Sequence, residues 1–265
     1  MLRRDGEGTV MELFEQIAKV VRIIELKHIL KAIIFPSHAL GAFKYHYRRV
    51  SERAFIGFLA KLWGCSPKDI DDAYNDLDSN LPLWKEIEKQ LSIYPSGYGL
   101  QMTKELPVLY LTVRLIQPDC IIETGVSAGA SSIYILRALE DNKKGKLYSI
   151  DLPPDNLPEG KTSGWIVPQY LKSRWTLHIG DSKDLLDPLL YDLGQIDCFV
   201  HDSLHTYEHM MWEYRTAWKY LRPRGLFLSH DVGADEAFFD FMNEKGIAWK
   251  DYRVFHVLGG FQKRA

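Results

Sequence analysis

Cys120-Ile-Ile-Glu-Thr-Gly-Val-Ser-Ala-Gly129 is the segment of this 265-residue chain that decides its fold. A short apolar run ends at Glu123, and Gly125 and Gly129 frame the turn that follows it. Glycine allows a tight turn and leaves room for a ligand beside the backbone. A helix is expected at residues 130–139, and its N-terminal amides would favour a carboxylate in that ligand. The segment therefore predicts a strand, a ligand-binding turn and a helix.

The same pattern continues toward the C-terminus. Apolar runs expected to be strands alternate with helix patterns, and they lie at residues 146–151, 175–179, 197–202 and 226–231. This alternation predicts a doubly wound α/β fold, a parallel sheet with helices on both faces. The end of the chain differs, because residues 253–263 are typical of an antiparallel hairpin that turns at Leu258-Gly-Gly260. A sheet that finishes in this way departs from the all-parallel dinucleotide-binding order.

The first 95 residues are helical in pattern. Apolar residues recur at spacings of three and four from Met11 to Ile34, and further helix starts are expected near Ser51, Ser66 and Leu81. We expect a helical N-terminal extension at residues 1–95, which would cap the site or form a homo-oligomer contact. The α/β domain would then occupy residues 96–265.

The composition excludes several classes of protein. Hydrophobic residues make up 46% and charged residues 26% of the chain, which is ordinary for a globular protein. A net charge of −2 gives no field that would recruit nucleic acid or an anionic membrane. The three cysteines form no Cys-x-x-Cys pair, and the most apolar early run is too short to cross a bilayer. We therefore expect a cytoplasmic location, with neither nucleic acid nor a membrane as partner.

Carboxylates stand at the ends of two of the expected strands. Asp151 ends the second strand, where it could accept hydrogen bonds from both ribose hydroxyls of an adenosine. Asp181, within Gly180-Asp-Ser182, ends the third strand, where it could reach the adenine amine. Because the carboxyl ends of parallel strands meet at one edge of the sheet, these residues predict a nucleoside-binding site there.

Taken together, these features resemble the class I methyltransferases, which use S-adenosylmethionine as cofactor. The likeness runs from Met102 to the C-terminus and includes the glycine turn, both strand-end aspartates and the terminal hairpin. It implies a Rossmann-like, seven-stranded sheet. It also implies that the residues lining the cofactor pocket are Glu123, Gly125, Ser127, Gly129, Asp151, Asp181 and Ser182.

Glu123 helps to distinguish between cofactors. A carboxylate beside a pyrophosphate would be repelled, whereas the ammonium or sulfonium group of S-adenosylmethionine would attract it. This residue and the terminal hairpin disfavour a nicotinamide cofactor. The alternative for Glu123 is a structural role, as a strand-end carboxylate that accepts hydrogen bonds from backbone amides.

A second motif, His201-Asp-Ser-Leu-His-Thr-Tyr-Glu208, follows the fourth strand. It resembles the Asp-x-x-His-x-Tyr signature of a branch related to macrolide-sugar O-methyltransferases and cephalosporin-biosynthesis proteins. The resemblance implies that Asp202 is a metal ligand and that His205 is the general base. The branch carries paired acids after the fifth strand, where this chain has His230 and Asp231.

The second motif suggests the reaction. A hydroxyl is a weak nucleophile at neutral pH, so it needs a base or a metal that lowers its pKa. We expect methyl transfer to the hydroxyl of a small molecule such as a sugar or secondary metabolite. The expected metal set is Asp202, His230 and Asp231, and the imidazole favours an ion softer than Mg²⁺. Whether a metal binds is left open.

Two other functions are weighed against this one. The imidazole of His230 in place of an acid would also suit a non-catalytic relative that binds S-adenosylmethionine without turnover. Gly125-Val-Ser-Ala-Gly129 matches the nucleophile elbow of the serine α/β-hydrolases, with Ser127, Asp231 and His256 in the required order. The helical pattern upstream of the turn disfavours a hydrolase, in which several strands would precede it.

Overall fold

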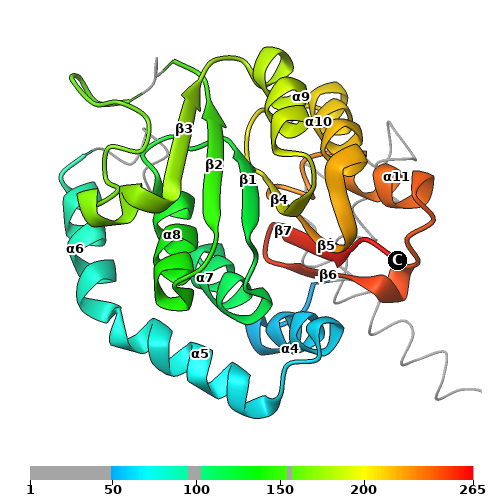
Figure 1. Ribbon diagram of the computed structural model, residues 1–265, viewed down its shortest axis with the longest axis horizontal. Helices are drawn as coiled ribbons and strands as arrows, with labels where there is room; N and C mark the ends of the chain where they lie inside the picture. The colour runs from blue at the N-terminus through cyan, green and yellow to red at the C-terminus, as the bar shows by residue number, and fades with distance from the viewer. Residues whose placement is uncertain (1–48, 95–102, 154–156, 265) are drawn as a thin grey trace, which may run out of the picture. The chain divides into compact units, whose positions relative to one another are not determined.

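Seven strands form one sheet in the computed structural model of the protein, which describes residues 49–94, 103–153 and 157–264. Their order across the sheet is β3-β2-β1-β4-β5-β7-β6 (Figure 1). The strands are β1 (Cys120–Thr124), β2 (Lys146–Asp151), β3 (Trp175–Ile179), β4 (Ile196–His201), β5 (Leu221–Ser229), β6 (Tyr252–Phe255) and β7 (Leu258–Gln262).

Strands β1 to β5 pair in parallel, and β7 pairs antiparallel with both β5 and β6. The predicted doubly wound sheet with a terminal antiparallel hairpin is confirmed. The helices that accompany it are α4 (Glu52–Trp63), α5 (Pro67–Ser79), α6 (Leu81–Ser92), α7 (Glu105–Ile116), α8 (Ala130–Asn142), α9 (Ser182–Leu193), α10 (Tyr207–Tyr220) and α11 (Ala237–Glu244), with short 3₁₀ helices η2 (Gln169–Arg174) and η3 (Trp249–Asp251).

The hairpin turns at a different place from the one predicted. Phe255 pairs with Leu258, so the turn consists of His256 and Val257, and the glycines lie inside β7. A Cβ on Gly259 would stand 2.6 Å from the Phe238 ring, and one on Gly260 would stand 2.8 Å from Leu228. These glycines are therefore explained by close packing against the sheet and α11, and the expected glycine turn was wrong.

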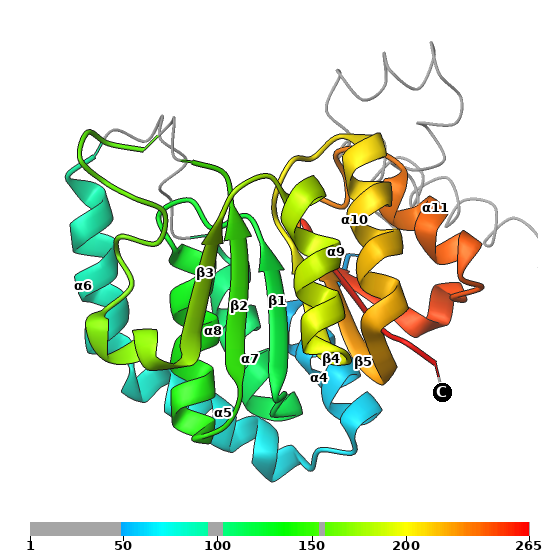
Figure 2. The same cartoon turned by 45° about the horizontal axis from the view of Figure 1, so that its top comes forward.

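The two faces of the sheet are covered by different helices, with α7 and α8 on one face and α9 and α10 on the other (Figures 1 and 2). Side chains of a strand alternate between faces. Leu226 and Leu228 of β5 belong to the core cluster formed with α4, α7 and α8. Phe227 points the other way, and its ring lies 5.2 Å from that of Tyr214 and 5.3 Å from that of Phe241.

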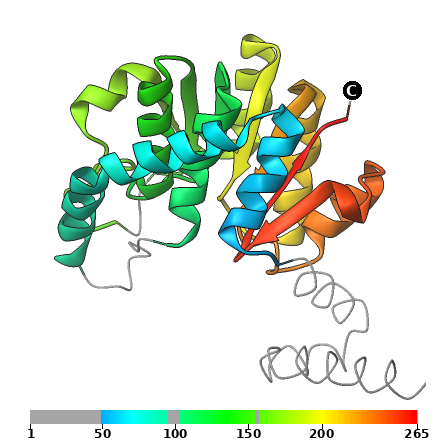
Figure 3. The same ribbon diagram turned by 90° about the horizontal axis from the view of Figure 1, so that it is seen from below.

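Helices α4, α5 and α6 belong to the same compact unit as the sheet. This unit begins at Val50. Figure 3 shows α4 alongside the terminal hairpin, and the Val50 amide donates to the Val254 carbonyl at 2.8 Å. The expected helix at residues 11–34 and the expected domain boundary near residue 95 lie outside the described residues.

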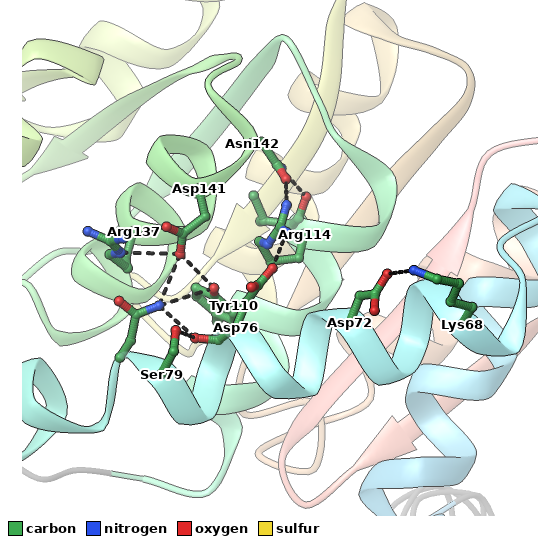
Figure 4. A network of polar contacts seen from close by, with 11 residues as sticks. Lys68, Asp72, Asp76, Ser79, Tyr110, Arg114, Arg137, Asp141 and Asn142 are labelled. Atoms are coloured by element: carbon green, nitrogen blue, oxygen red, sulfur yellow. Dashed lines mark hydrogen bonds and ion pairs between the residues drawn. The ribbon is translucent and has the colours of Figure 1, made fainter.

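A polar network fastens α5 to α7 and α8 (Figure 4). The Asp141 carboxylate accepts hydrogen bonds from the Tyr110 hydroxyl at 2.6 Å and the Asn80 amide at 3.0 Å, and it also pairs with Arg137. Arg114 of α7 bridges to Asp76 of α5 and to Asn142 at the end of α8. These contacts lie away from the carboxyl ends of the strands, so their role is structural.

Among the described residues, none of the helices has the length and hydrophobicity that crossing a membrane requires.

Candidate active site

A cavity of about 390 Å³ opens at the carboxyl ends of β1 to β4. The glycine turn forms one wall, and residues that follow β2, β3 and β4 complete it. Five of the predicted cofactor residues line this cavity, namely Gly125, Ser127, Asp151, Asp181 and Ser182. Glu123 and Gly129 are not on its wall.

The backbone explains why Gly125 must be glycine. Its φ of +86° lies in the left-handed region, and a Cβ would stand 2.0 Å from the carbonyl oxygen of Asp202. The neighbouring amides extend the strand ladder, since Gly125 N donates to Ile150 O at 2.9 Å and Asp202 N donates to Thr124 O at 2.8 Å. The turn after β1 is therefore packed directly against the turn after β4.

Ser127 and Asp151 meet across the cavity wall. Ser127 has a φ of +52°, uncommon for a residue with a side chain. Its amide donates to Asp151 Oδ2 at 3.1 Å, so the aspartate holds the turn in this shape. Asp151 lines the cavity, and its other carboxylate oxygen is the one suited to accept from a ribose hydroxyl.

Gly129 allows the long segment after β2 to pack closely against the glycine turn. A Cβ on Gly129 would stand 2.9 Å from Gly164 Cα, and the Gly164 amide donates to Ser127 O at 2.8 Å. Trp165 packs edge-on against the Tyr94 ring at 5.3 Å. Of the described residues in this segment, Leu152, Pro153 and Leu157 line the cavity.

Asp181 and Ser182 begin α9. The Asp181 carboxylate caps the helix by accepting from the Lys183 amide at 2.8 Å. The Ser182 hydroxyl lies 3.2 Å from His209 Nε2 and is buried at the cavity floor. The capped helix thus fixes both side chains at the carboxyl end of β3.

Glu123 is fully buried beneath the glycine turn. Its two oxygens accept hydrogen bonds from Ser131 at 2.7 Å, Ser132 at 2.6 Å and Ser149 at 2.7 Å. Burial raises the pKa of Glu123 to about 7, against the opposing effect of the three hydroxyl donors. The donors are serine hydroxyls, and the backbone amides weighed from the sequence are not among the contacts described.

The second predicted cluster is assembled beside the cavity. Asp202 Oδ1 lies 3.0 Å from His230 Nδ1 and 3.6 Å from His205 Nε2, while Asp231 Oδ2 lies 3.5 Å from His205 Nδ1. The four side chains come from the turns after β4 and β5, which the His230 N to His201 O bond of 2.8 Å holds together. Asp202 also lines the cavity, so it is shared by both parts of the site.

The pKa values of the two histidines in this cluster are shifted in opposite directions. Burial lowers the pKa of His205, so its imidazole favours the neutral form. Burial acts in the same sense on His230, but the Asp202 carboxylate outweighs it and raises the pKa of His230 to about 9. His205 is thus the member of the pair that can accept a proton near neutral pH.

Three of these groups also form a candidate metal site. Asp202, His205 and His230 each bring one ligand atom within 4.8 Å of the others. His205 Nε2 is a buried nitrogen without a hydrogen-bond partner among the described residues, whereas His230 Nδ1 lies 3.0 Å from Asp202 Oδ1. Two imidazoles and one carboxylate fit Mn²⁺, Fe²⁺ or Zn²⁺ better than Mg²⁺. This set differs from the predicted one, in which Asp231 was the third ligand.

The sequence did not single out Glu213 of α10. This carboxylate is fully buried and accepts hydrogen bonds from Thr124, His201, Ser203 and His209. The spacing of four residues between His209 and Glu213 on one helix was the available signal, but a pair of that kind is common on exposed helix faces.

A seven-stranded sheet of this order, with a nucleoside-sized cavity over its carboxyl ends, is the arrangement that the resemblance to class I methyltransferases implied. Residues 122–232 match the family model of a methyltransferase domain. The matched segment contains every cofactor and catalytic residue predicted from the sequence. No curated protein matches the chain.

Several solved structures are similar to this chain. One is a methyltransferase of Podospora anserina bound to S-adenosylhomocysteine, 13% identical, with a TM-score of 0.49 over 76% of this chain and 89% of the other. Another is the O-methyltransferase TomG of Streptomyces achromogenes, involved in tomaymycin synthesis, 17% identical, with a TM-score of 0.47 over 75% and 91%. A third is a putative O-methyltransferase of Klebsiella pneumoniae, 16% identical, with a TM-score of 0.48 over 83% and 99%.

The structure does not provide the arrangement that a serine α/β-hydrolase would need around Ser127. Ser127 follows β1, the first strand of the sheet in chain order, and its amide is occupied by Asp151. His256, the histidine that the triad would need, lies in the hairpin turn. Its Nδ1 is 3.9 Å from Oε1 of Glu105. We therefore do not assign Ser127 as a nucleophile.

The packing of Gly125 leads to a prediction about stability. Gly125→Ala would place a Cβ against the Asp202 carbonyl, so either turn must move, at a cost typical of overpacking, about 1–3 kcal/mol. Gly160→Ala is the matched control, because Gly160 has a similar φ of +74° but no atom within 4 Å of the added Cβ. Urea unfolding should show that Gly125→Ala lowers the unfolding free energy by this amount more than Gly160→Ala does. Equal losses would mean that only backbone strain matters.

The raised pKa of Glu123 predicts a pH dependence. In the unfolded chain the carboxyl titrates near its ordinary value of 4.5, and in the folded chain near 7. The folded state therefore holds the proton more tightly, so this contribution to stability is full below pH 4.5 and is lost as the pH rises through 7. Wild type should lose about 3 kcal/mol relative to Glu123→Gln across this window.

Glu123→Gln is a suitable reference because serine hydroxyls can donate to or accept from an amide. The measurement is the unfolding free energy in urea at several pH values, with the two proteins compared at each. Parallel curves would show that Glu123 ionises in the folded protein as readily as in the unfolded chain.

Proposed function

We propose that this chain is an S-adenosylmethionine-dependent methyltransferase that acts on the hydroxyl of a small molecule, such as a sugar or secondary metabolite. The observation that supports this most directly is the double position of Asp202. Asp202 lines the nucleoside-sized cavity, and its carboxylate also contacts His205 and His230. A methyl donor in the cavity would thus end beside the groups that can activate an acceptor.

The cavity offers each part of the cofactor a suitable partner. Asp151 would accept from the ribose hydroxyls, Asp181 would receive the adenine amine, and Ser182 would contact the adenine ring. Gly125 and Ser127 would allow the amino acid portion to approach the backbone. Glu123 would act from beneath, by ordering Ser131 and Ser132 at the start of α8. Gly129 would act through the segment around Gly164 that it supports.

His205 is proposed as the general base. S-adenosylmethionine supplies a methyl group on a positively charged sulfur. Transfer of this methyl group to an acceptor oxygen would leave the electron pair of the broken carbon–sulfur bond on sulfur, and His205 would take the hydroxyl proton. The lowered pKa of His205, caused by burial, keeps its ring neutral and ready for this step. Asp202 and Asp231 would orient the ring and stabilise the imidazolium that forms.

A divalent ion at Asp202, His205 and His230 is the alternative use of the same cluster. It is supported by the closeness of the three ligand atoms and by the buried Nε2 of His205, which lacks a hydrogen-bond partner in the described part of the chain. Such an ion would lower the pKa of an acceptor hydroxyl. His205 would then serve as a ligand and could not also be the base. The two arrangements therefore exclude each other.

The remaining parts of the proposal rest on the sequence. A net charge of −2 supports a small-molecule acceptor over nucleic acid, and a cytoplasmic location is proposed on the cysteine content. Self-association through the N-terminal helices is kept as a prediction; of the extension at residues 1–95, the structure describes residues 49–94.

Isothermal titration with S-adenosylmethionine and S-adenosylhomocysteine tests the cofactor. Wild type should bind both with micromolar dissociation constants. Asp151→Ala should weaken binding about 100-fold, the effect of losing charged hydrogen bonds of about 3 kcal/mol in total. Asp184→Ala is the control, because Asp184 is exposed on α9 and does not line the cavity. Absence of binding by folded wild type would refute the proposed function.

Titration with Mn²⁺ distinguishes the two uses of the histidine cluster. If an ion binds at Asp202, His205 and His230, each of the variants Asp202→Asn and His230→Ala should weaken Mn²⁺ binding at least tenfold, which is within the range reported for lost ligand-shell groups. His178→Ala is the control, since His178 lies in β3 outside this set. If wild type shows no Mn²⁺ binding that these variants abolish, His205 is left as the base.

A further inference from the structure

Glu105, the first residue of α7, is a buried carboxylate that the proposed function leaves unused. The residue is only 5% exposed. Within the described residues its side chain makes an ion contact with His256, whose Nδ1 lies 3.9 Å from Glu105 Oε1, and no hydrogen bond. Burying a carboxylate without donors is costly, because water solvates it in the unfolded chain. A group of this kind in a folded protein calls for an explanation, and a ligand is one.

His256 brings this pair to the edge of the sheet where the site lies. It stands in the turn between β6 and β7, and the Val232 amide donates to the Val257 carbonyl at 3.1 Å. The hairpin turn therefore lies against the segment that carries His230 and Asp231. Both Asp231 and His256 have a φ of +50°, which is uncommon for residues with side chains and is found most often at functional sites.

The sheet order places the histidine cluster between the cavity and the Glu105–His256 pair. The cavity lies over β1 to β4, the cluster follows β4 and β5, and the hairpin turn comes next at β7 (Figure 1). Against the lowering effect of burial, Asp202 raises the pKa of His230 most strongly, and Glu105 adds to it. Glu105 therefore lies within electrostatic reach of the cluster. The side chain of His256 is 33% exposed, so this end of the site is open to a ligand.

We propose that Glu105 is a specificity-determining residue, whose carboxylate, with His256 beside it, accepts a hydrogen bond from a second hydroxyl of the methyl acceptor. The first hydroxyl of that acceptor would lie at His205 and receive the methyl group. An acceptor with a single hydroxyl would leave Glu105 without a donor, so the site selects a polyol. The inference rests on the proposed function, because that function supplies the acceptor.

A structural role for Glu105 predicts a different effect on stability. An acid in the first turn favours a helix through its dipole, and Glu52 has that position in α4, where it also accepts from the Tyr74 hydroxyl at 2.8 Å. Glu52→Gln should therefore lower the midpoint of urea unfolding. Glu105→Gln should leave the midpoint unchanged or raise it, because an uncharged amide is less costly to bury. A fall as large as that of Glu52→Gln would overturn the proposal.

Release of S-adenosylhomocysteine tests the specificity, with the methyl glycosides of glucose, galactose, mannose and rhamnose as probes. Wild type should methylate at least one of them. Glu105→Ala should raise the KM for that glycoside roughly tenfold or more, the effect of losing a hydrogen bond to a charged group, with kcat within about threefold of wild type. Its dissociation constant for S-adenosylhomocysteine should be unchanged. Glu52→Ala, the matched control, should change neither KM nor kcat.

Deoxy derivatives of the accepted glycoside identify the hydroxyl that Glu105 contacts. Wild type should lose roughly tenfold in KM on one derivative, and Glu105→Ala should lose nothing further on it, since both changes remove the same bond. Equal losses for Glu105→Ala on every derivative would overturn the proposal. So would wild type that binds S-adenosylmethionine and methylates none of the glycosides. Failure to bind S-adenosylmethionine would instead refute the proposed function.

Discussion

The close contact between Gly125 and the Asp202 carbonyl is the constraint on which the rest of the site depends. A side chain at position 125 would need space that the turn after β4 already occupies, with a Cβ only 2.0 Å from the carbonyl oxygen. This contact joins the turn that would hold the cofactor to the turn that carries Asp202 and His205. The cavity and the histidine cluster are consequently parts of one rigid structure.

Backbone hydrogen bonds carry this rigidity beyond the ends of the strands. Asp202 N bonds to Thr124 O, Gly180 N to Asp151 O and His230 N to His201 O, each at 2.8 Å. Every one of these bonds extends a parallel ladder by one residue into the site. The functional side chains therefore stand at positions set by the sheet, although they belong to turns.

Two buried glutamates support this edge of the sheet in opposite electrostatic states. Burial dominates at Glu123, where three neutral hydroxyl donors leave the pKa raised to about 7. At Glu213, burial is outweighed by the hydrogen bonds of two imidazoles, and the pKa is held low. The two imidazoles at Glu213, which Glu123 lacks, account for the opposite directions of the two pKa shifts.

The sequence predicted what depends on strand ends and failed where packing between distant segments decides. The strand–turn–helix around Gly125 and the aspartates at positions 151, 181 and 202 follow from local patterns, because parallel strands bring their carboxyl ends to one edge. Gly129 and Gly259 lie in or near the elements where the sequence predicted them, but the reason for glycine at these positions was not predicted. Each packs closely against a segment distant in the chain, which no local pattern identifies. Glu213 could not be recognised, because its four donors lie up to 89 residues away along the chain.

The substitution of histidine at position 230 changes the charge of the cluster and thereby the range of chemistry open to it. The ring of His230 lies 3.0 Å from Asp202 and 3.7 Å from Asp231, and the raised pKa of His230 favours the protonated form, which balances part of their negative charge. A metal ion at the same place must displace that proton, and its binding must weaken as the pH falls. A second carboxylate would attract an ion at no such cost, whereas this imidazole sets a proton and a metal ion in competition. Under the proposed function, His205 would be available as a base when the proton prevails.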